Sequence, residues 1–139
     1  MTEKRFFAAR EIDALIPQLE HIFDHIQICK NRIEALVAQG LSVPSSPAAA
    51  DLAQQQMTRS QVEFLMQAVE EDVHHIHSLG GVAKDLDAGL VDFLGDLEGR
   101  EVWLCWKKGE PRVRFWHPLD GGFAHRKAIP YPETNPLIH

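Results

Sequence analysis

The sequence has no apolar run that approaches the ~20 residues needed to cross a membrane, and residues 1–20 lack the apolar core of a signal peptide. Basic residues are also scarce, because 14 Lys and Arg stand against 20 Asp and Glu, for a net charge of −6. Nucleic acids and anionic membranes both attract a basic face. The sequence therefore predicts a protein without a membrane span, a signal peptide or a nucleic-acid partner.

Cysteine is rare, with Cys29 and Cys105 far apart in a chain of 139 residues. This usage is typical of reduced thiols in the cytoplasm, so we expect no disulfide between them. Cys105 stands between two tryptophans in a predicted strand, where apolar surroundings raise the pKa of a thiol. The glycine pairs at 80–81 and 121–122 lack the strand-to-helix context of a phosphate-binding loop. Neither nucleophilic catalysis nor nucleotide binding is indicated.

Two long helices are predicted in the first half of the chain. Apolar residues recur at helical spacing from Ile12 to residue 37, in a stripe wider than one partner helix requires. Because Pro17 interrupts this stripe, we expect a kink or a restart near Asp13–Pro17, and we expect Gly40 to end the helix. A second helix is predicted from a Ser46-Pro47 cap to about Leu79, with an alanine-rich first part that projects beyond the core.

The second half of the chain is predicted to form a small sheet. Val102–Trp106 and Arg112–His117 are typical of two strands joined by a turn that contains a glycine. Shorter extended segments are expected at Val82–Lys84 and Leu90–Phe93. Because an isolated hairpin is marginal in water, the sheet must pack on the helices.

These patterns together predict one α+β domain over residues 1–139. Its parts are a long antiparallel two-helix hairpin at about 9–79, a β-rich segment at about 82–126 and an extended tail at 127–139. Strand alternation is expected to separate Trp103 and Trp116 from Trp106 and Phe115. One pair would face the helices, and the other would face solvent or a partner.

Four stretches of the sequence are jointly similar to one family: FFAAREIDALIP, GLVDF, LCWKKGEP and FWHPLDGGFAHR. They resemble the bacterial domain-of-unknown-function family numbered 2203 over nearly the whole chain. Two positions depart from its opening segment, since Asp13 stands where that segment has Asn and Ala8 stands at a usual Ser or Thr cap. The resemblance implies a bacterial cytoplasmic protein with no assigned activity, and it implies no substrate and no catalytic residue.

The polar residues after Gly109 are the first candidate ligand-binding site. They come from a turn, a strand end and a loop, where a rigid scaffold presents functional groups: Glu110, His117, Asp120 and Arg126, with Trp116 among them. A histidine beside carboxylates can act as a base or bind a metal, and Asp85, Asp87 and Asp92 could converge on the same edge. Alternatively, an ion pair between Arg126 and one of these carboxylates only fastens the loop.

A second candidate, for a metal, lies on the second helix at Glu71, His74 and His77. Glu71 and His74 have the carboxylate–histidine spacing of helical di-iron sites, although the first helix offers no matching motif. His21 and His25 also lie one helical turn apart. The alternative is a solvated helix face, because these histidines flank the apolar stripe.

The sequence identifies no cofactor and no catalytic residue, so an enzyme is not favoured. We predict a non-enzymatic cytoplasmic interaction module that self-associates through its helices as a dimer or a higher homo-oligomer. The alternative is a small-molecule or metal-binding protein, with or without enzymatic activity, whose site is built on Glu110, His117, Asp120 and Arg126.

Overall fold

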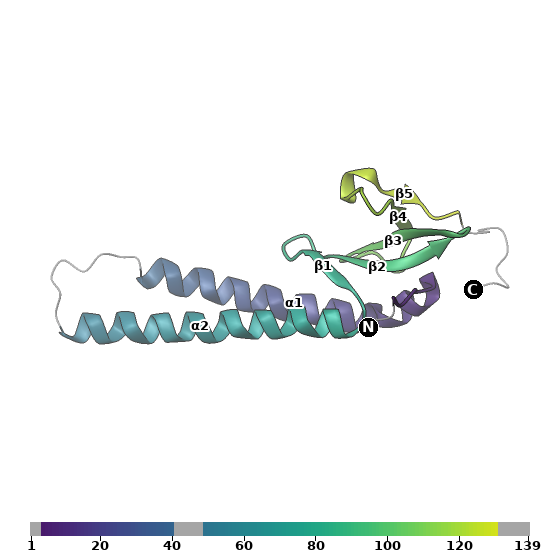
Figure 1. The fold of residues 1–139 in the computed structure, drawn as a ribbon. Helices are drawn as coiled ribbons and strands as arrows, with labels where there is room; N and C mark the ends of the chain where they lie inside the picture. The colour runs from purple at the N-terminus through teal and green to yellow at the C-terminus, as the bar shows by residue number, and fades with distance from the viewer. Residues whose placement is uncertain (1–3, 41–48, 131–139) are drawn as a thin grey trace.

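The structure is a computed structural model that describes residues 4–40 and 49–130. Its elements in chain order are α1 (Ala9–Gly40), α2 (Ala49–Ser78), β1 (Val82–Asp85), β2 (Leu90–Leu97), β3 (Arg100–Lys107), β4 (Phe115–His117), the 3-10 helix η1 (Phe123–His125) and β5 (Lys127–Ala128). The predicted α+β fold is confirmed: the antiparallel hairpin of α1 and α2 packs on an antiparallel five-stranded sheet (Figure 1). The expected Ser46-Pro47 cap and the tail residues 131–139 lie outside the described residues.

Helix α1 begins beside Ala8 with help from Glu11, whose carboxylate accepts a hydrogen bond from the Ala8 backbone nitrogen at 2.7 Å. This contact is the glutamate half of a capping box, and it forms without a Ser or Thr at Ala8. Pro17 is exposed and lies inside a continuous helix, so the chain does not restart there. The kink expected near Asp13–Pro17 stays a prediction. The helix ends at Gly40, as its sequence indicates.

Helix α1 supplies most of the helical contribution to the core. Its buried side chains recur every three or four residues and so form one stripe: Ile12, Ile16, Leu19, Ile22, Phe23, Ile26, Cys29 and Leu36. Six of these eight side chains, from Ile12 to Ile26, share one buried cluster with residues of the sheet. Within it the rings of Phe23 and Trp106 are in contact, with centroids 6.1 Å apart. The first half of α1 is therefore the centre of the fold.

Helix α2 is much less buried than α1. Among its described side chains only Ile76 is buried, and it has no exposed surface. The helix ends where Gly80, with φ of +102°, takes the left-handed conformation that a helix C-cap requires. Any side chain at Gly80 would overlap the ring of Phe7. Figure 1 shows that the end of α2 lies beside the sheet, while its beginning extends far beyond it.

The sheet is a meander in which each strand pairs with the next along the chain. Its longest pairing joins β2 to β3, from Leu90 opposite Lys107 to Leu97 opposite Arg100. The turn between these strands places Glu98 and Gly99 at φ of +54° and +84°, as in the two-residue turns that match strand twist. Strand β2 thus extends well past the segment that the sequence indicated.

Strand β4 is shorter than predicted, beginning at Phe115 instead of Arg112. The backbone nitrogen of Val113 donates instead to Asp13 Oδ1 on α1, at 2.7 Å. Ile129 N donates to the carbonyl oxygen of Arg114 at 2.8 Å, just before the pairing of β4 with β5. The chain before β4 is therefore held by a helix and by the C-terminal strand.

The register of β3 and β4 corrects the predicted grouping of the aromatic residues. Trp116 lies opposite Leu104, and Phe115 lies opposite Cys105. Directly opposed residues share a face, so Trp116 is on the same face as Trp106, which packs on α1. The prediction that Trp116 accompanies Trp103 was wrong, because it depended on a pairing register that alternation within each strand does not determine.

A membrane span is absent from the helices of the described residues: neither α1 nor α2 is apolar over the length that a crossing requires.

Candidate functional site

The candidate site lies on the outer face of the sheet, which we define by the side chains that point away from α1. The register places Asp92, Cys105 and Phe115 in one row across three strands, and Leu94, Trp103 and His117 in the next row. Antiparallel pairing sets opposed side chains about 4.5–5.5 Å apart. Three residues that can bind a proton or a metal, namely Asp92, Cys105 and His117, are thereby brought together.

These three side chains are almost completely buried. Their exposed fractions are 2% for Asp92, 1% for Cys105 and 2% for His117. Their donor atoms all lie within 4.8 Å of one another, and no other group of three potential metal ligands among residues 4–40 and 49–130 is this close. A buried polar cluster of this kind must satisfy its own hydrogen bonds and charges.

The two ring nitrogens of His117 both face oxygen atoms. Nδ1 lies 2.9 Å from the carbonyl oxygen of Pro118, and Nε2 lies 2.8 Å from Asp92 Oδ2. A carbonyl oxygen only accepts, so Nδ1 carries a proton. Between Nε2 and the carboxylate, a second proton or another cation must be shared, because two lone pairs would otherwise oppose each other. Asp92 Oδ1 is buried without a hydrogen-bond partner in the described structure.

Cys105 is held as a neutral thiol by its surroundings. Burial raises the pKa of Cys105 to about 12, and the negative charge of Asp92 adds to this effect. Arg126 lowers the pKa by a smaller amount. Apolar surroundings were expected to suppress this thiol, and the structure adds a carboxylate as the second cause. Cys29 on α1 is also buried and free, and burial followed by the charge of Asp72 raises its pKa.

Arg126 and Glu110 form a second polar contact beside the cluster. Arg126 Nη2 donates to Glu110 Oε1 at 2.7 Å and to the carbonyl oxygen of Cys105 at 3.2 Å. The guanidinium lies over the rings of Phe115 and Phe123, 4.1 and 4.8 Å from their centroids. This pair fastens η1 to β3, which agrees with the structural alternative considered for Arg126.

The other residues of the predicted ligand-binding site do not join this cluster. Asp120 is exposed and makes no hydrogen bond or ion pair with the described part of the chain. Trp116 is half-buried on the opposite face, with Arg100 and Lys127 above its ring at 5.4 and 5.3 Å from the centroid. Glu110 and Arg126 thus pair with each other and His117 joins the buried cluster, whereas Asp120 and Trp116 take part in neither contact.

Of the three acidic residues considered after α2, only one joins the cluster. Asp92 belongs to the cluster, whereas the Oδ1 atom of Asp85 accepts hydrogen bonds from the backbone nitrogens of Asp87 and Ala88, each at 2.9 Å. Asp87 pairs with Lys30 on α1. Asp92 points toward the outer face because side chains alternate along β2. Asp85 instead stabilises the turn that precedes this strand.

The helical histidines lie at the surface of the hairpin. Glu71, His74 and His77 are exposed, and Glu71 accepts a hydrogen bond from Gln67 Nε2 at 3.5 Å. On the hairpin, His25 Nδ1 lies 2.5 Å from Asp72 Oδ2. Both residues line a groove of about 590 Å³ between α1 and α2. A metal site at Glu71, His74 and His77 stays a prediction.

The comparisons with known proteins identify a family but no function. Neither the search of curated proteins nor the search of solved structures found a match. A family described as "Uncharacterized conserved protein (DUF2203)" matches residues 5–129, which include α1, α2, the whole sheet and the buried cluster. The chain therefore belongs to the DUF2203 family of uncharacterized conserved proteins.

Proposed function

We propose that this protein is a non-enzymatic cytoplasmic interaction module that associates with a second copy of itself through the far half of its helical hairpin. The far half is defined as residues 28–40 of α1 and 52–66 of α2. The observation that carries the proposal is the exposure of Met57 and Phe64 on one flank of α2. Four further large apolar side chains of the far half are also exposed: Ile28, Val37, Leu52 and Met66. Large apolar side chains that gather at an exposed surface are typical of interaction sites.

One flank of the far half is strongly apolar. A groove of about 370 Å³ between the helices is lined by Leu36 from α1 and by Met57, Phe64 and Leu65 from α2, with Arg32, Ser60 and Gln61 beside them. Phe64 is 73% exposed and Met57 is 59% exposed. Covering these two side chains on association would remove the largest exposed apolar groups of α2 from water.

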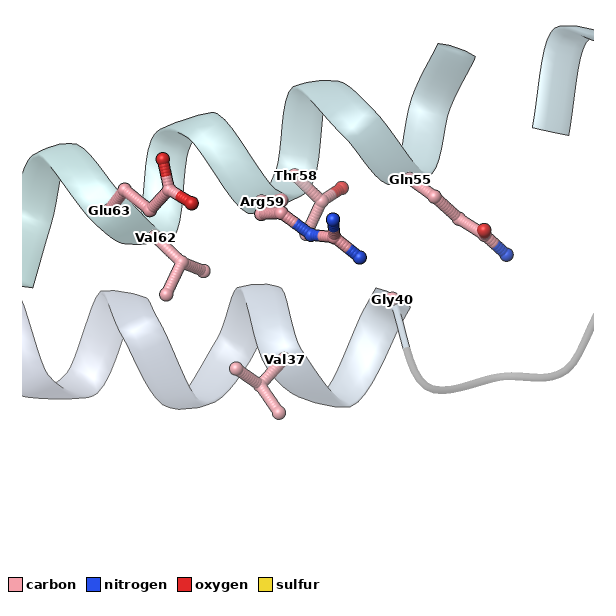
Figure 2. A pocket seen from close by; sticks show the side chains of 7 residues that line it. All are labelled: Val37, Gly40, Gln55, Thr58, Arg59, Val62 and Glu63. Atoms are coloured by element: carbon pink, nitrogen blue, oxygen red, sulfur yellow. The ribbon is translucent and has the colours of Figure 1, made fainter. Parts of the chain in front are cut away.

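The other flank is more polar. Figure 2 shows its groove near Gly40, where Arg59, Glu63 and Gln55 accompany Val37 and Val62. Phe64 and Arg59 are five residues apart, which places them about 140° apart around a helix. The two grooves therefore lie on different sides of the hairpin, and the Phe64 flank is the one that apolar burial favours.

The spacing on the Phe64 flank suits a second copy of the same chain. Met57 and Phe64 are one heptad apart, the repeat at which helices pack against each other over several turns. Two antiparallel α2 helices related by a twofold axis would place Phe64 of each copy against Met57 of the other. The two hairpins would then form a four-helix bundle with the sheets at its outer ends.

Light scattering after size exclusion tests this proposal with three matched charge substitutions. Phe64→Glu should convert the dimer to a monomer, because it places a charge in the apolar contact. Leu119→Glu, at a 48% exposed site in the loop between β4 and η1, should leave the dimer intact. Met66 is seven residues from Arg59, which places it on the polar side of α2. Met66→Glu should therefore also leave the dimer intact. A dimer that survives Phe64→Glu, or that dissociates only with Met66→Glu, contradicts the proposed contact.

A further inference from the structure

We propose that Asp92, Cys105 and His117 together bind one divalent transition-metal ion, with zinc as the metal that suits this donor set best. The site is independent of the proposed self-association, because the cluster lies on the outer face of the sheet and the hairpin contact lies on α1 and α2. It combines one carboxylate oxygen, one thiol sulfur and one imidazole nitrogen from three neighbouring strands. Carboxylate, thiolate and imidazole are the ligands that zinc takes in proteins.

The distances between the donor atoms suit a single ion. A tetrahedral zinc ion with bonds of about 2.0–2.3 Å holds its ligand atoms about 3.3–3.8 Å apart. In the cluster, His117 Nε2 and Asp92 Oδ2 are 2.8 Å apart, and all donor atoms are within 4.8 Å of one another. Side-chain rotations that move the donor atoms by about an ångström would therefore bring them to these distances, without any movement of the strands.

The orientation of His117 is that of a metal ligand with a fixed ring. Its Nδ1 donates to the carbonyl oxygen of Pro118, so Nε2 is the nitrogen that points at Asp92 and Cys105. Histidines that bind metals usually donate their other ring nitrogen to a carbonyl or carboxylate oxygen, and this bond sets the tautomer. The backbone turn at Pro118 thus prepares the imidazole for binding.

The charges of the cluster also accommodate the ion. On binding, the proton shared by His117 Nε2 and Asp92 and the thiol proton of Cys105 would leave to solvent. One divalent ion replaces these two protons, so the net charge of the buried site does not change. Asp92 Oδ1, which has no hydrogen-bond partner among the described residues, supplies a further lone pair. Three protein ligands leave the fourth position of the ion to a water molecule or another small ligand.

The histidine groove of the hairpin is the competing site for a metal. It contains His21, His25, Asp72 and His75, and Cys29 Sγ lies 3.8 Å from His25 Nε2. Its side chains are more exposed, however, and no three of their donor atoms approach one another as closely as those of the sheet cluster do. Because each site has one cysteine, the metal–sulfur bond can be used to distinguish them.

Cobalt(II) is the probe, because a thiolate bound to it gives a charge-transfer absorption in the near ultraviolet. The full-length protein, stripped of metal by a chelator, is titrated with Co²⁺ under reducing conditions. The wild type should bind one ion per chain and show the charge-transfer band. Cys105→Ser should abolish the band, and the matched variant Cys29→Ser should retain it. Asp92→Asn should weaken Co²⁺ binding by at least about tenfold.

Several outcomes of this experiment would overturn the proposal. Folded wild-type protein that binds Co²⁺ without the band, or does not bind it, excludes the site whatever the variants do. A band that persists in Cys105→Ser and disappears in Cys29→Ser places the ion in the hairpin groove instead. If Cys105→Ser does not fold, the wild-type titration and the Cys29→Ser variant still decide the outcome. None of these results depends on the oligomeric state.

Discussion

The two ends of this molecule are built in different ways. At the end that carries the sheet, α1 is covered by the sheet on one side and by α2 on another, and Trp106, Phe93 and Ile12 have no exposed surface. At the far end of the hairpin, the described parts of the two helices pack only on each other, and Phe64 is 73% exposed. The comparison teaches that buried packing is concentrated at one end, while most of the exposed large apolar side chains lie at the other.

The two histidine–aspartate pairs differ in the same way. His117 and Asp92 are each 3% exposed in their side chains, whereas His25 and Asp72 are 50% and 18% exposed. A buried pair cannot exchange its partner for water, but an exposed histidine can. The same chemical contact therefore has a structural consequence at the sheet and little consequence on the hairpin.

The largest effect is expected from removing the central aromatic residue of the core. Trp106→Ala should lower the free energy of unfolding by about 3–5 kcal/mol, because it leaves a cavity between β3 and α1. Phe64→Ala should change it by less than about 0.5 kcal/mol in the monomer, since Phe64 packs little. Urea denaturation at low protein concentration measures both. Equal losses would show that the two ends contribute alike.

A smaller difference in the free energy of unfolding is expected between variants of His117 and His25. His117→Ala should cost about 3 kcal/mol, because it leaves the Asp92 carboxylate buried without its partner. His25→Ala, which removes the exposed pair, should cost less than about 1 kcal/mol. Thermal unfolding of both variants in a chelating buffer makes the comparison without any contribution of metal. A larger loss for His25→Ala would contradict the assignment of the buried pair as the structural one.

The smallest difference in the free energy of unfolding is expected between variants of two aspartates on α1. Asp13→Ala should cost about 1–2 kcal/mol, because Asp13 accepts from the buried backbone nitrogen of Val113. Asp24→Ala removes a surface contact with Lys108 and should cost less than about 1 kcal/mol. Chemical denaturation of the two variants measures the difference. Indistinguishable stabilities would show that the link from α1 to β4 is not important.

Much of the fold could be predicted from the sequence, because periodicity reports which residues are buried. The stripe from Ile12 to Leu36 indicated a helix with one covered face, and the second helix ends at Ser78, next to its predicted end at about Leu79. The extent of β2 was missed because its turn, Glu98-Gly99, is not one of the common hairpin pairs. The length of β4 depended on Asp13, a residue distant in sequence, so local patterns could not determine it.

The candidate site was predicted only in part, and strand register explains the difference. His117 was selected because it ends a predicted strand and has carboxylates near it in the sequence, but its partners Asp92 and Cys105 lie on two other strands. Cys105 was interpreted as a suppressed thiol, and Asp92 as one acid among three. The sign that could have joined them is a polar residue within the apolar strand β2, since a buried aspartate needs a partner.

The most direct test of the account is sedimentation velocity of the wild-type protein from low micromolar to tens of micromolar. The exposed apolar flank with Met57 and Phe64 predicts a species of twice the mass of the 15.7 kDa chain, with a population that rises with concentration. A single species of monomer mass over the whole range would contradict the proposal that the far half of the hairpin binds a second copy.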